Sequence, residues 1–198
     1  NFHLDAQEAA RDQMRRNIDA WLPLLESSEV EAVVINASGC GGMVREYAQH
    51  LRYDPAYADK AQRVVDHVKD VAEFLAPMAA QVRARMRSAP GRVAFHPPCT
   101  LQHWQGLRPV AERLLNDLGF DLQIFADSHL CCGSAGTYSI TQPELSKKLR
   151  DRKLSAIHET LPDCIVSANI GCITHLQSGT GTPVRHWIEL VDEAISHE

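Results

Sequence analysis

The chain has 198 residues, of which 44% are hydrophobic and 23% are charged. This composition is typical of a globular protein and excludes a disordered, collagenous or coiled-coil chain. The formal net charge of −5 argues against a general nucleic-acid binder, which needs clustered Lys and Arg. No apolar run reaches the ~18 residues of a membrane-spanning helix.

The spacing of apolar residues predicts helices and strands that alternate along the chain. The expected helices cover residues 5–26, about 54–77, 107–118, about 141–160 and 187–196. The expected strands cover residues 31–36, 92–96, 121–125, 164–168 and 183–186. Thr141-Gln-Pro-Glu144 has the form of a capping box at the start of the fourth helix. The alternation predicts an α/β fold with open, mostly parallel sheets and helices on both faces.

The six cysteines are the residues that carry most chemical information. A chain of this length needs no disulfide scaffold, so reduced thiols for metal or redox chemistry are the expected use. Cys164 lies at the start of a predicted strand and is interpreted as a small core residue. The others follow predicted strand ends, where open α/β sheets bind ligands. These are Cys40, Cys99, Cys131, Cys132 and Cys172.

Two segments share a layout of strand, small turn and Gly-Cys, and they end at Cys40 and Cys172. This layout predicts two copies of one unit. Residues 1–88 would be the C-terminal part of the first unit with connecting helices, and residues 89–198 a second, complete unit. We expect the missing ligands of Cys40 to lie upstream of Asn1, so that Cys40 cannot complete a metal site in this chain.

The adjacent pair Cys131-Cys132 is the most discriminating motif. One Zn²⁺ is usually held by cysteines two to four residues apart, whereas neighbouring side chains diverge and suit a multinuclear iron–sulfur cluster. Gly133 and Gly136 allow a tight turn beside a bulky inorganic core, and N–H groups of such a loop can bond cluster sulfides. A zinc site, a dithiol–disulfide switch and purely structural thiols remain as alternatives.

Histidines near the cysteines are candidates for supporting roles. His175 follows Cys172 at a C-x-x-H spacing that can close a metal site. His129 precedes the cysteine pair by two residues and can donate a hydrogen bond to a thiolate. His96 and His103 lie near Cys99. The sequence has no G-x-G-x-x-G, Walker, H-E-x-x-H or G-x-S-x-G motif, which argues against the enzyme classes that use them.

Several motifs resemble the cysteine-rich CCG-domain family, and the most specific stretch runs from Cys131 to Cys172. The motifs include His96-Pro-Pro-Cys99, Cys131-Cys-Gly-Ser-Ala-Gly-Thr-Tyr138, Ser167-Ala-Asn-Ile-Gly-Cys-Ile-Thr-His175 and His186-Trp-Ile-Glu-Leu190. Within the family, the chain looks most like the C-terminal half of glycolate oxidase iron–sulfur subunits. More distant members are the CCG-containing subunits of heterodisulfide reductase and of anaerobic glycerol-3-phosphate dehydrogenase, and the lactate-utilisation iron–sulfur proteins.

The resemblance implies two related CCG lobes, the first incomplete, in an iron–sulfur electron-transfer subunit. A flavoprotein subunit of such a complex oxidises glycolate, a 2-hydroxy acid, and electrons pass through iron–sulfur centres towards the membrane quinone pool. The isolated chain is therefore expected not to be catalytic. The implied location is cytoplasmic, peripheral to the inner face of the membrane, and no nucleic-acid partner is implied.

The resemblance also implies a ligand set, with a [4Fe–4S] cluster held by Cys99, Cys131, Cys132 and Cys172. The predicted surrounding residues are His96, His129, Gly133 and Gly136. The family pattern ends in C-x-x-C, but Asn169 stands three residues before Cys172, so Asn169 or His175 is a possible auxiliary contact. The departure puts a non-cubane cluster in doubt. Two alternatives remain: a zinc-stabilised or metal-free scaffold for the flavoprotein, and a thiol/disulfide redox module similar to that of heterodisulfide reductase.

Overall fold

The computed structural model describes residues 6–88 and 91–195. The chain forms two compact units, Asn1–Val71 and Ala72–Glu198. This division rests on contacts, whereas the boundary predicted at residue 88 rests on the repeat, and the assignment of the two parts as CCG units stays a prediction. Both units combine helices with parallel strands, which confirms the predicted α/β class.

The first unit packs a long helix against a small two-stranded sheet. Helix α1 (Gln7–Glu26) buries an apolar stripe that includes Met14, Ile18 and Leu22. The remaining elements are β1 (Val33–Ile35), α2 (Ser38–Arg45), α3 (Tyr47–His50), α4 (Ala58–Val65) and β2 (Val68–Asp70). Strands β1 and β2 pair in parallel, with Val33 opposite Val68. Residue 5 of the first expected helix lies outside the described residues.

The single helix expected over about 54–77 is wrong. Helix α4 ends at Val65, strand β2 follows, and the chain continues as α5 (Val71–Leu75), a 3₁₀ turn (Ala76–Met78) and α6 (Ala79–Arg85). Val64 and Val68 have helical spacing, but β1 needs a strand beside it to satisfy its backbone groups. Within β2, Val68 and Asp70 are buried and Lys69 between them is exposed, as in a strand with one buried face.

The second unit is built on a four-stranded parallel sheet. Its strands are β3 (Arg92–Phe95), β4 (Asp121–Leu122), β5 (Cys164–Ser167) and β6 (Val184–His186). Their order is β4-β3-β5-β6, and every neighbouring pair is parallel. Strand β4 is shorter than predicted, because the chain leaves the sheet after Leu122.

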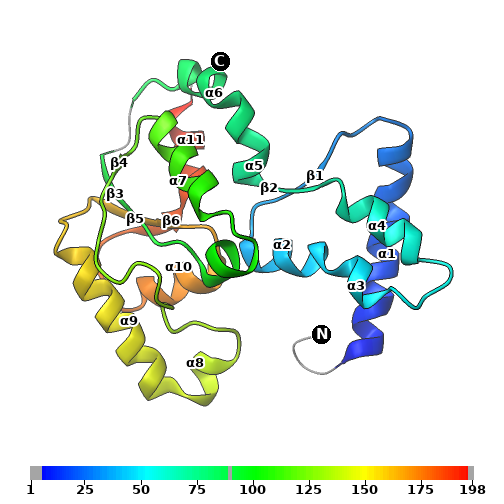
Figure 1. The fold of residues 1–198 in the computed structure, drawn as a ribbon. Helices are drawn as coiled ribbons and strands as arrows, with labels where there is room; N and C mark the ends of the chain where they lie inside the picture. Colours follow the sequence, from blue (N-terminus) through cyan, green and yellow to red (C-terminus); the bar gives the residue numbers. More distant parts are fainter. Residues whose placement is uncertain (1–5, 89–90, 196–198) are drawn as a thin grey trace. The chain divides into compact units, whose positions relative to one another are not determined.

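Helices cover both faces of this sheet, as predicted. They are α7 (Arg108–Asp117), α8 (Tyr138–Thr141), α9 (Pro143–His158), α10 (Ile170–Gln177) and α11 (Trp187–Ala194), with a π-helical turn at Thr100–Trp104. Helices α9 and α10 lie on one side of the strands, and α7 and α11 on the other (Figure 1). Right-handed crossovers explain why α7 lies opposite α9 and α10, because the direction of strand addition reverses between β3 and β5.

The predicted capping box of α9 does not form. Thr141 belongs to α8, and its hydroxyl donates to the carbonyl of Thr137 at 3.2 Å. Gln142 occupies the N-cap position of α9 without a side-chain hydrogen bond, and Pro143 opens the helix. A proline is favourable at the first helical position, because its fixed φ suits the helix and an N–H there would have no partner within the helix.

The repeated layout seen in the sequence corresponds to repeated elements. Strand β1 leads into α2 with Cys40 as its third residue, and β5 leads into α10 with Cys172 as its third residue. The following strand and helix also correspond in sequence, as Val68-Lys-Asp-Val-Ala-Glu73 and Val184-Arg-His-Trp-Ile-Glu189. Both halves therefore contain a strand that leads into an eight-residue helix and, later, a strand that leads into another helix, but α3 and α4 are inserted between these two pairs in the first half.

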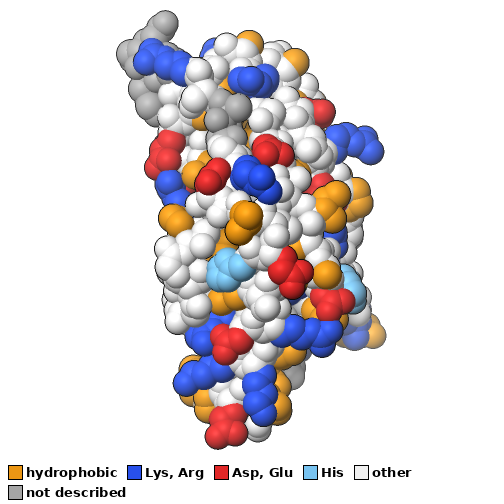
Figure 2. Space-filling model, turned by 90° about the vertical axis from the view of Figure 1, so that its left-hand side faces the viewer, with side chains coloured by type: hydrophobic (Ala, Val, Ile, Leu, Met, Phe, Trp, Pro, Cys, Tyr) orange, Lys and Arg blue, Asp and Glu red, His pale blue; other side chains and the backbone are white. Residues whose placement is uncertain are grey.

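Charged side chains of both signs occur on the surface of the molecule (Figure 2). Acidic and basic side chains are interspersed on the face shown in Figure 2, so this face carries no continuous basic stripe. Among the described residues, no helix combines the length and apolar character needed to cross a bilayer.

Candidate metal centre

Four cysteines meet at the carboxyl edge of the second sheet. Cys99 follows β3, Cys131 and Cys132 lie in the segment after β4, and Cys172 lies in the first turn of α10 after β5. Strand order reverses between β3 and β5, and such a switch point opens a crevice in which α/β proteins bind ligands. We call Cys99, Cys131, Cys132 and Cys172 the cysteine centre.

The sulfur atoms of the cysteine centre form a continuous hydrogen-bonded series. Cys131 contacts both Cys99 and Cys132. Cys132 in turn contacts Cys172. The ligand atoms of His96, Cys132 and Cys172 all lie within 4.8 Å of one another. All six cysteines of the chain are free thiols, so these contacts are not disulfides.

The cysteine centre is closed on one side and open on the other. Cys132 is 1% exposed and Cys172 is 9% exposed, whereas Cys99 and Cys131 are half-buried. Cys132 and Cys172 belong to the apolar core formed with Phe125, Leu154 and other residues of α9 and α10. Any ion would therefore enter past Cys99 and Cys131.

The four thiols shift one another's pKa in opposite directions. Hydrogen bonds from Cys132 and Cys99 lower the pKa of Cys131, while contact with Cys131 raises the pKa of Cys99. Contact with Cys131 raises the pKa of Cys132 as well. The hydrogen bond with Cys132 lowers the pKa of Cys172, and His96 acts in the same direction. Cys131 and Cys172 thus accept hydrogen bonds, and the thiols of Cys99 and Cys132 donate them. A soft metal cation can take the place of the protons in these hydrogen bonds.

The loop that carries the cysteine pair supplies backbone donors to sulfur. The Gly133 N–H donates to Cys131 Sγ at 3.3 Å, and the Ser134 N–H donates to Cys132. Hydrogen bonds of this kind stabilise thiolates and tune iron–sulfur centres. Gly133 has φ +95°, and a Cβ there would overlap the Ser146 carbonyl oxygen of α9.

Ser146 fixes this loop to α9. Its side chain is fully buried, and its hydroxyl donates to the Gly133 carbonyl at 2.8 Å. His175 Nε2 lies 3.1 Å from Ser146 Oγ and 3.3 Å from the Ser146 carbonyl oxygen. The Asn169 side chain accepts from the Gly171 N–H at 2.9 Å and caps α10. In this structure, therefore, His175 supports the loop and Asn169 supports the helix, and their roles as auxiliary ligands stay predictions.

His96 lies directly against the cysteine centre. It is 0% exposed, and its backbone N–H donates to Val166 at 2.8 Å while its carbonyl accepts from the Ser167 hydroxyl at 2.9 Å. Neither ring nitrogen has an oxygen or nitrogen partner among the described residues, and its polar neighbour is the Cys172 sulfur. A buried imidazole in this state is suited to bonding a thiolate or an ion.

Four other residues that the sequence analysis singled out remain to be placed: His129, Gly136, Cys40 and Cys164. His129 is exposed, and its backbone carbonyl lies within hydrogen-bond distance of Gln102 Nε2 and His103 Nε2. Gly136 has φ +58° with open space around it. Cys40 is exposed on α2 in the first unit, and Cys164 is half-buried at the start of β5.

Lys153 is a residue of this region that was not predicted from the sequence. It is 3% exposed on α9, and its ammonium donates to the Asp127 carbonyl at 2.6 Å. Burial lowers its pKa to about 8, and electrostatic interactions with sulfur atoms of the cysteine centre and with Asp127 oppose this shift. The sequence feature that indicates its burial is its position on the apolar stripe of α9, beside Leu154 and four residues before Ile157.

The donor set fits an iron–sulfur cluster. Four sulfurs share one site, two of them away from solvent, and backbone N–H groups already point at sulfur. Zn²⁺ also accepts sulfur and imidazole ligands, so His96, Cys132 and Cys172 form a second possible donor set.

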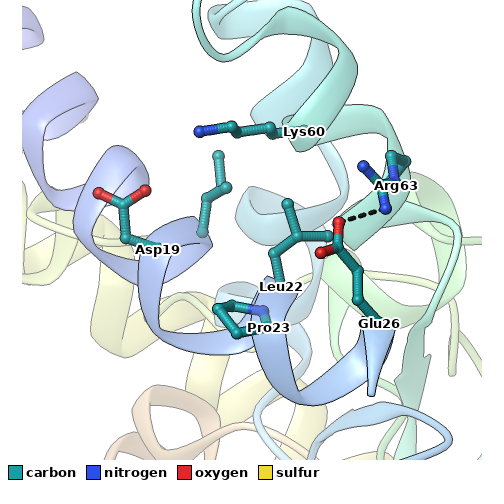
Figure 3. A pocket seen from close by; sticks show the side chains of 7 residues that line it. Asp19, Leu22, Pro23, Glu26, Lys60 and Arg63 are labelled. Atoms are coloured by element: carbon teal, nitrogen blue, oxygen red, sulfur yellow. Dashed lines mark ion pairs between the residues drawn. The ribbon is translucent and has the colours of Figure 1, made fainter. Parts of the chain in front are cut away.

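A separate hollow of about 200 Å³ lies between α1 and α4 in the first unit. It is open and shallow, and an ion pair between Arg63 and Glu26 crosses one side of it (Figure 3). Asp19 at its rim accepts a hydrogen bond from the Tyr57 hydroxyl at 2.8 Å. None of its lining residues is a cysteine or histidine, so it does not share the sulfur chemistry of the cysteine centre.

Comparison with known proteins agrees with this geometry. Residues 93–177 match the cysteine-rich domain named CCG. The match runs from the first strand of the second sheet to the end of α10 and contains the whole cysteine centre. The resemblance to the CCG family is thereby confirmed.

Three curated relatives are similar to almost the whole chain. The glycolate oxidase iron-sulfur subunit of Escherichia coli is 48% identical over all 198 residues, which are 48% of that protein. The probable glycolate oxidase iron-sulfur subunit of Bacillus subtilis is 29% identical over 99% of the chain and 45% of its own length. Lactate utilization protein A of Geobacillus thermodenitrificans is 28% identical over 98% of the chain and 77% of its own length. The chain thus spans about half the length of the first two relatives.

Proposed function

We propose that the chain is part of an iron–sulfur electron-transfer subunit of a glycolate-oxidising complex. The observation that carries this proposal is the contact of four cysteine sulfurs at the carboxyl edge of the second sheet. The 48% identity to the glycolate oxidase iron-sulfur subunit supports the choice of complex. Cys99, Cys131, Cys132 and Cys172 would hold a [4Fe–4S] cluster.

A bound cluster would supply a one-electron carrier, and the chain's own residues would set its surroundings. Buried Cys132 and Cys172 keep water from one side of the site. The N–H groups of Gly133 and Ser134 favour sulfur that carries negative charge. An iron–sulfur cluster carries single electrons and not hydrides, so substrate oxidation would belong to a flavoprotein partner.

The proposal also covers the partner subunits of the chain and its location in the cell. A flavoprotein subunit would deliver electrons to the centre, and a quinone-linked acceptor would receive them further along the complex. The site would then lie at the cytoplasmic side of the membrane, held there through partner subunits. The relatives named for glycolate oxidase and lactate utilisation support a 2-hydroxy-acid oxidoreductase.

Anaerobic reconstitution with iron and sulfide tests the metal assignment. We expect about four iron and four sulfide per chain, with visible absorption and an EPR signal on reduction. Cys132→Ser should lose most of the iron, and Cys164→Ser, in the same unit but outside the centre, should retain it. Stoichiometric zinc in the purified protein with no iron uptake would overturn the proposal.

A zinc-stabilised scaffold is the second candidate. It is favoured by the grouping of His96, Cys132 and Cys172 within 4.8 Å, because one nitrogen and several sulfurs suit tetrahedral zinc. This candidate predicts one zinc per chain, no visible absorption and no redox titration. Loss of the bound metal in His96→Ala would favour it, since the cluster assignment needs no histidine ligand.

A further inference from the structure

Lys153 is a buried cation that forms no ion pair with a described carboxylate, although the Asp127 carboxylate attracts it at longer range. Its ammonium donates to the backbone carbonyl of Asp127, while the Asp127 carboxylate pairs at 2.5 Å with Arg152. No described carboxylate forms an ion pair with Lys153. Lys153 is 3% exposed to solvent, and burying a positive charge is costly unless negative charge lies close to it.

Sulfur atoms of the cysteine centre act on Lys153 together with the Asp127 carboxylate. The Lys153 ammonium lies 5.4 Å from the centre of the Phe125 ring, and Phe125 packs with Cys132 in one buried cluster. The lysine interacts electrostatically with Cys132, Cys99 and Cys131, three of the four members of the cysteine centre. Its neighbours Lys147 and Lys148 on α9 are exposed, so burial singles out this one lysine of the helix.

We propose that Lys153 is the buried counter-ion of the cysteine centre, placed there to stabilise negative charge on its sulfurs. The inference rests on the proposed function where it concerns a bound cluster. A fixed positive charge close to a redox centre favours the state with one more electron, so Lys153 would raise the reduction potential. Its hydrogen bond to Asp127 would also hold the segment that leads into Cys131.

Two substitutions separate these two effects. Lys153→Gln removes the charge and keeps an N–H donor for the Asp127 carbonyl, whereas Lys153→Met removes both. Lys147→Met removes the same charge from an exposed position of the same helix and is the matched control. Circular dichroism and thermal unfolding establish that each variant is folded before the comparison.

The first measurement is the midpoint potential of the reconstituted proteins by anaerobic optical titration. Both Lys153 variants should shift to more negative potential, with at least a tenfold change in the one-electron equilibrium, or about 59 mV. Lys147→Met should match the wild type. A potential unchanged in Lys153→Gln and Lys153→Met would overturn the counter-ion role. A loss of iron in Lys153→Met alone would support the loop-holding contact.

The second measurement needs no metal. In the reduced, metal-free chain, the rate of iodoacetamide reaction at Cys99 and Cys131 follows the amount of thiolate. Both Lys153 variants should react several-fold more slowly, and Lys147→Met should react like the wild type. Equal rates would overturn the placement of Lys153. If the wild type takes up no iron, the proposed function fails, and this rate comparison still decides the role of Lys153.

Discussion

At the scale of single residues, Gly133 holds the cysteine loop against α9. Its φ of +95° favours glycine, and its α-carbon lies so near the Ser146 carbonyl that no side chain fits between them. Ser146 adds a hydrogen bond to the Gly133 carbonyl at 2.8 Å. The backbone donors to Cys131 and Cys132 therefore depend on a close approach that only glycine permits.

Replacing Gly133 by alanine should disrupt this loop. The positive φ alone costs about 1–3 kcal/mol, and the overlap with the α9 backbone adds to it. Gly136→Ala is the matched control, because Gly136 also has positive φ (+58°) but has open space around it. Urea unfolding should give a larger loss of stability for Gly133→Ala than for Gly136→Ala. Equal midpoints in the two variants would show that the close approach does not matter.

Sequence could predict the cysteine centre because cysteines are rare and their positions after strands are meaningful. Cys99, Cys131, Cys132 and Cys172 were placed at strand ends from the apolar pattern alone, and the structure brings them together. Lys153 could not be identified in this way, because a lysine on a helix is usually exposed. Its burial depends on the packing of α9 over the cysteine centre.

At the scale of elements, an ion pair between Arg15 and Asp54 links helix α1 to the turn before α4 in the first unit. Arg15 on α1 donates to the Asp54 carboxylate at 2.8 Å, and Asp54 also accepts from the Ala56 N–H at 3.0 Å ahead of α4. The hydrogen bond from Arg15 lowers the pKa of Asp54 below its ordinary value of 3.8. The charged form of Asp54 therefore favours the folded state.

The stabilising effect of Asp54 should depend on pH in a defined direction. Because its pKa is lower in the folded state, its contribution is complete above about pH 5 and is lost as pH falls through 3.8 and below. Asp54→Asn should therefore be less stable than the wild type at pH 7, with the difference shrinking in acid and in high salt. Thermal unfolding at several pH values measures this, with Glu29→Gln as the exposed control. A difference that is constant from pH 7 to pH 3 would contradict the assigned charge interaction.

Helices and strands can be predicted from the sequence where the local apolar pattern and the packing in the folded protein favour the same element. The helix expected over 107–118 and the strand expected over 92–96 correspond to α7 and β3. Strand β2 was missed because three residues give too short a pattern, and Val64 and Val68 also fit helical spacing. Only the presence of β1 as a parallel neighbour decides between the two, and that information is not local.

At the scale of the whole molecule, the chain uses the same strand-to-helix step twice, from β1 into α2 and from β5 into α10, with different results. Cys172 and Cys40 occupy the same third position of an eight-residue helix after a strand. Cys172 meets three other cysteines, whereas Cys40 is exposed on α2. The two helices thus place a cysteine at the same position, and among the described residues further cysteines gather around Cys172 but not around Cys40.

This contrast gives a test with a built-in control. Cys172→Ser should abolish most iron uptake during anaerobic reconstitution, because a ligand between Cys132 and His96 is lost. Cys40→Ser changes the corresponding position of the other copy and should leave the iron content of this chain unchanged. The measurement is iron and sulfide per chain. Equal loss in both variants would mean that Cys40 takes part in metal binding.

The wide spacing of the cysteines along the chain means that the folded sheet, and not a short peptide, brings the cysteine centre together. Thirty-one residues separate Cys99 from Cys131, and 39 separate Cys132 from Cys172. No short peptide of this chain holds all four sulfurs, so the sheet must assemble before a complete binding site exists. If the centre takes up a cluster as proposed, a delivery protein would meet an already folded surface and reach the centre past half-buried Cys99 and Cys131.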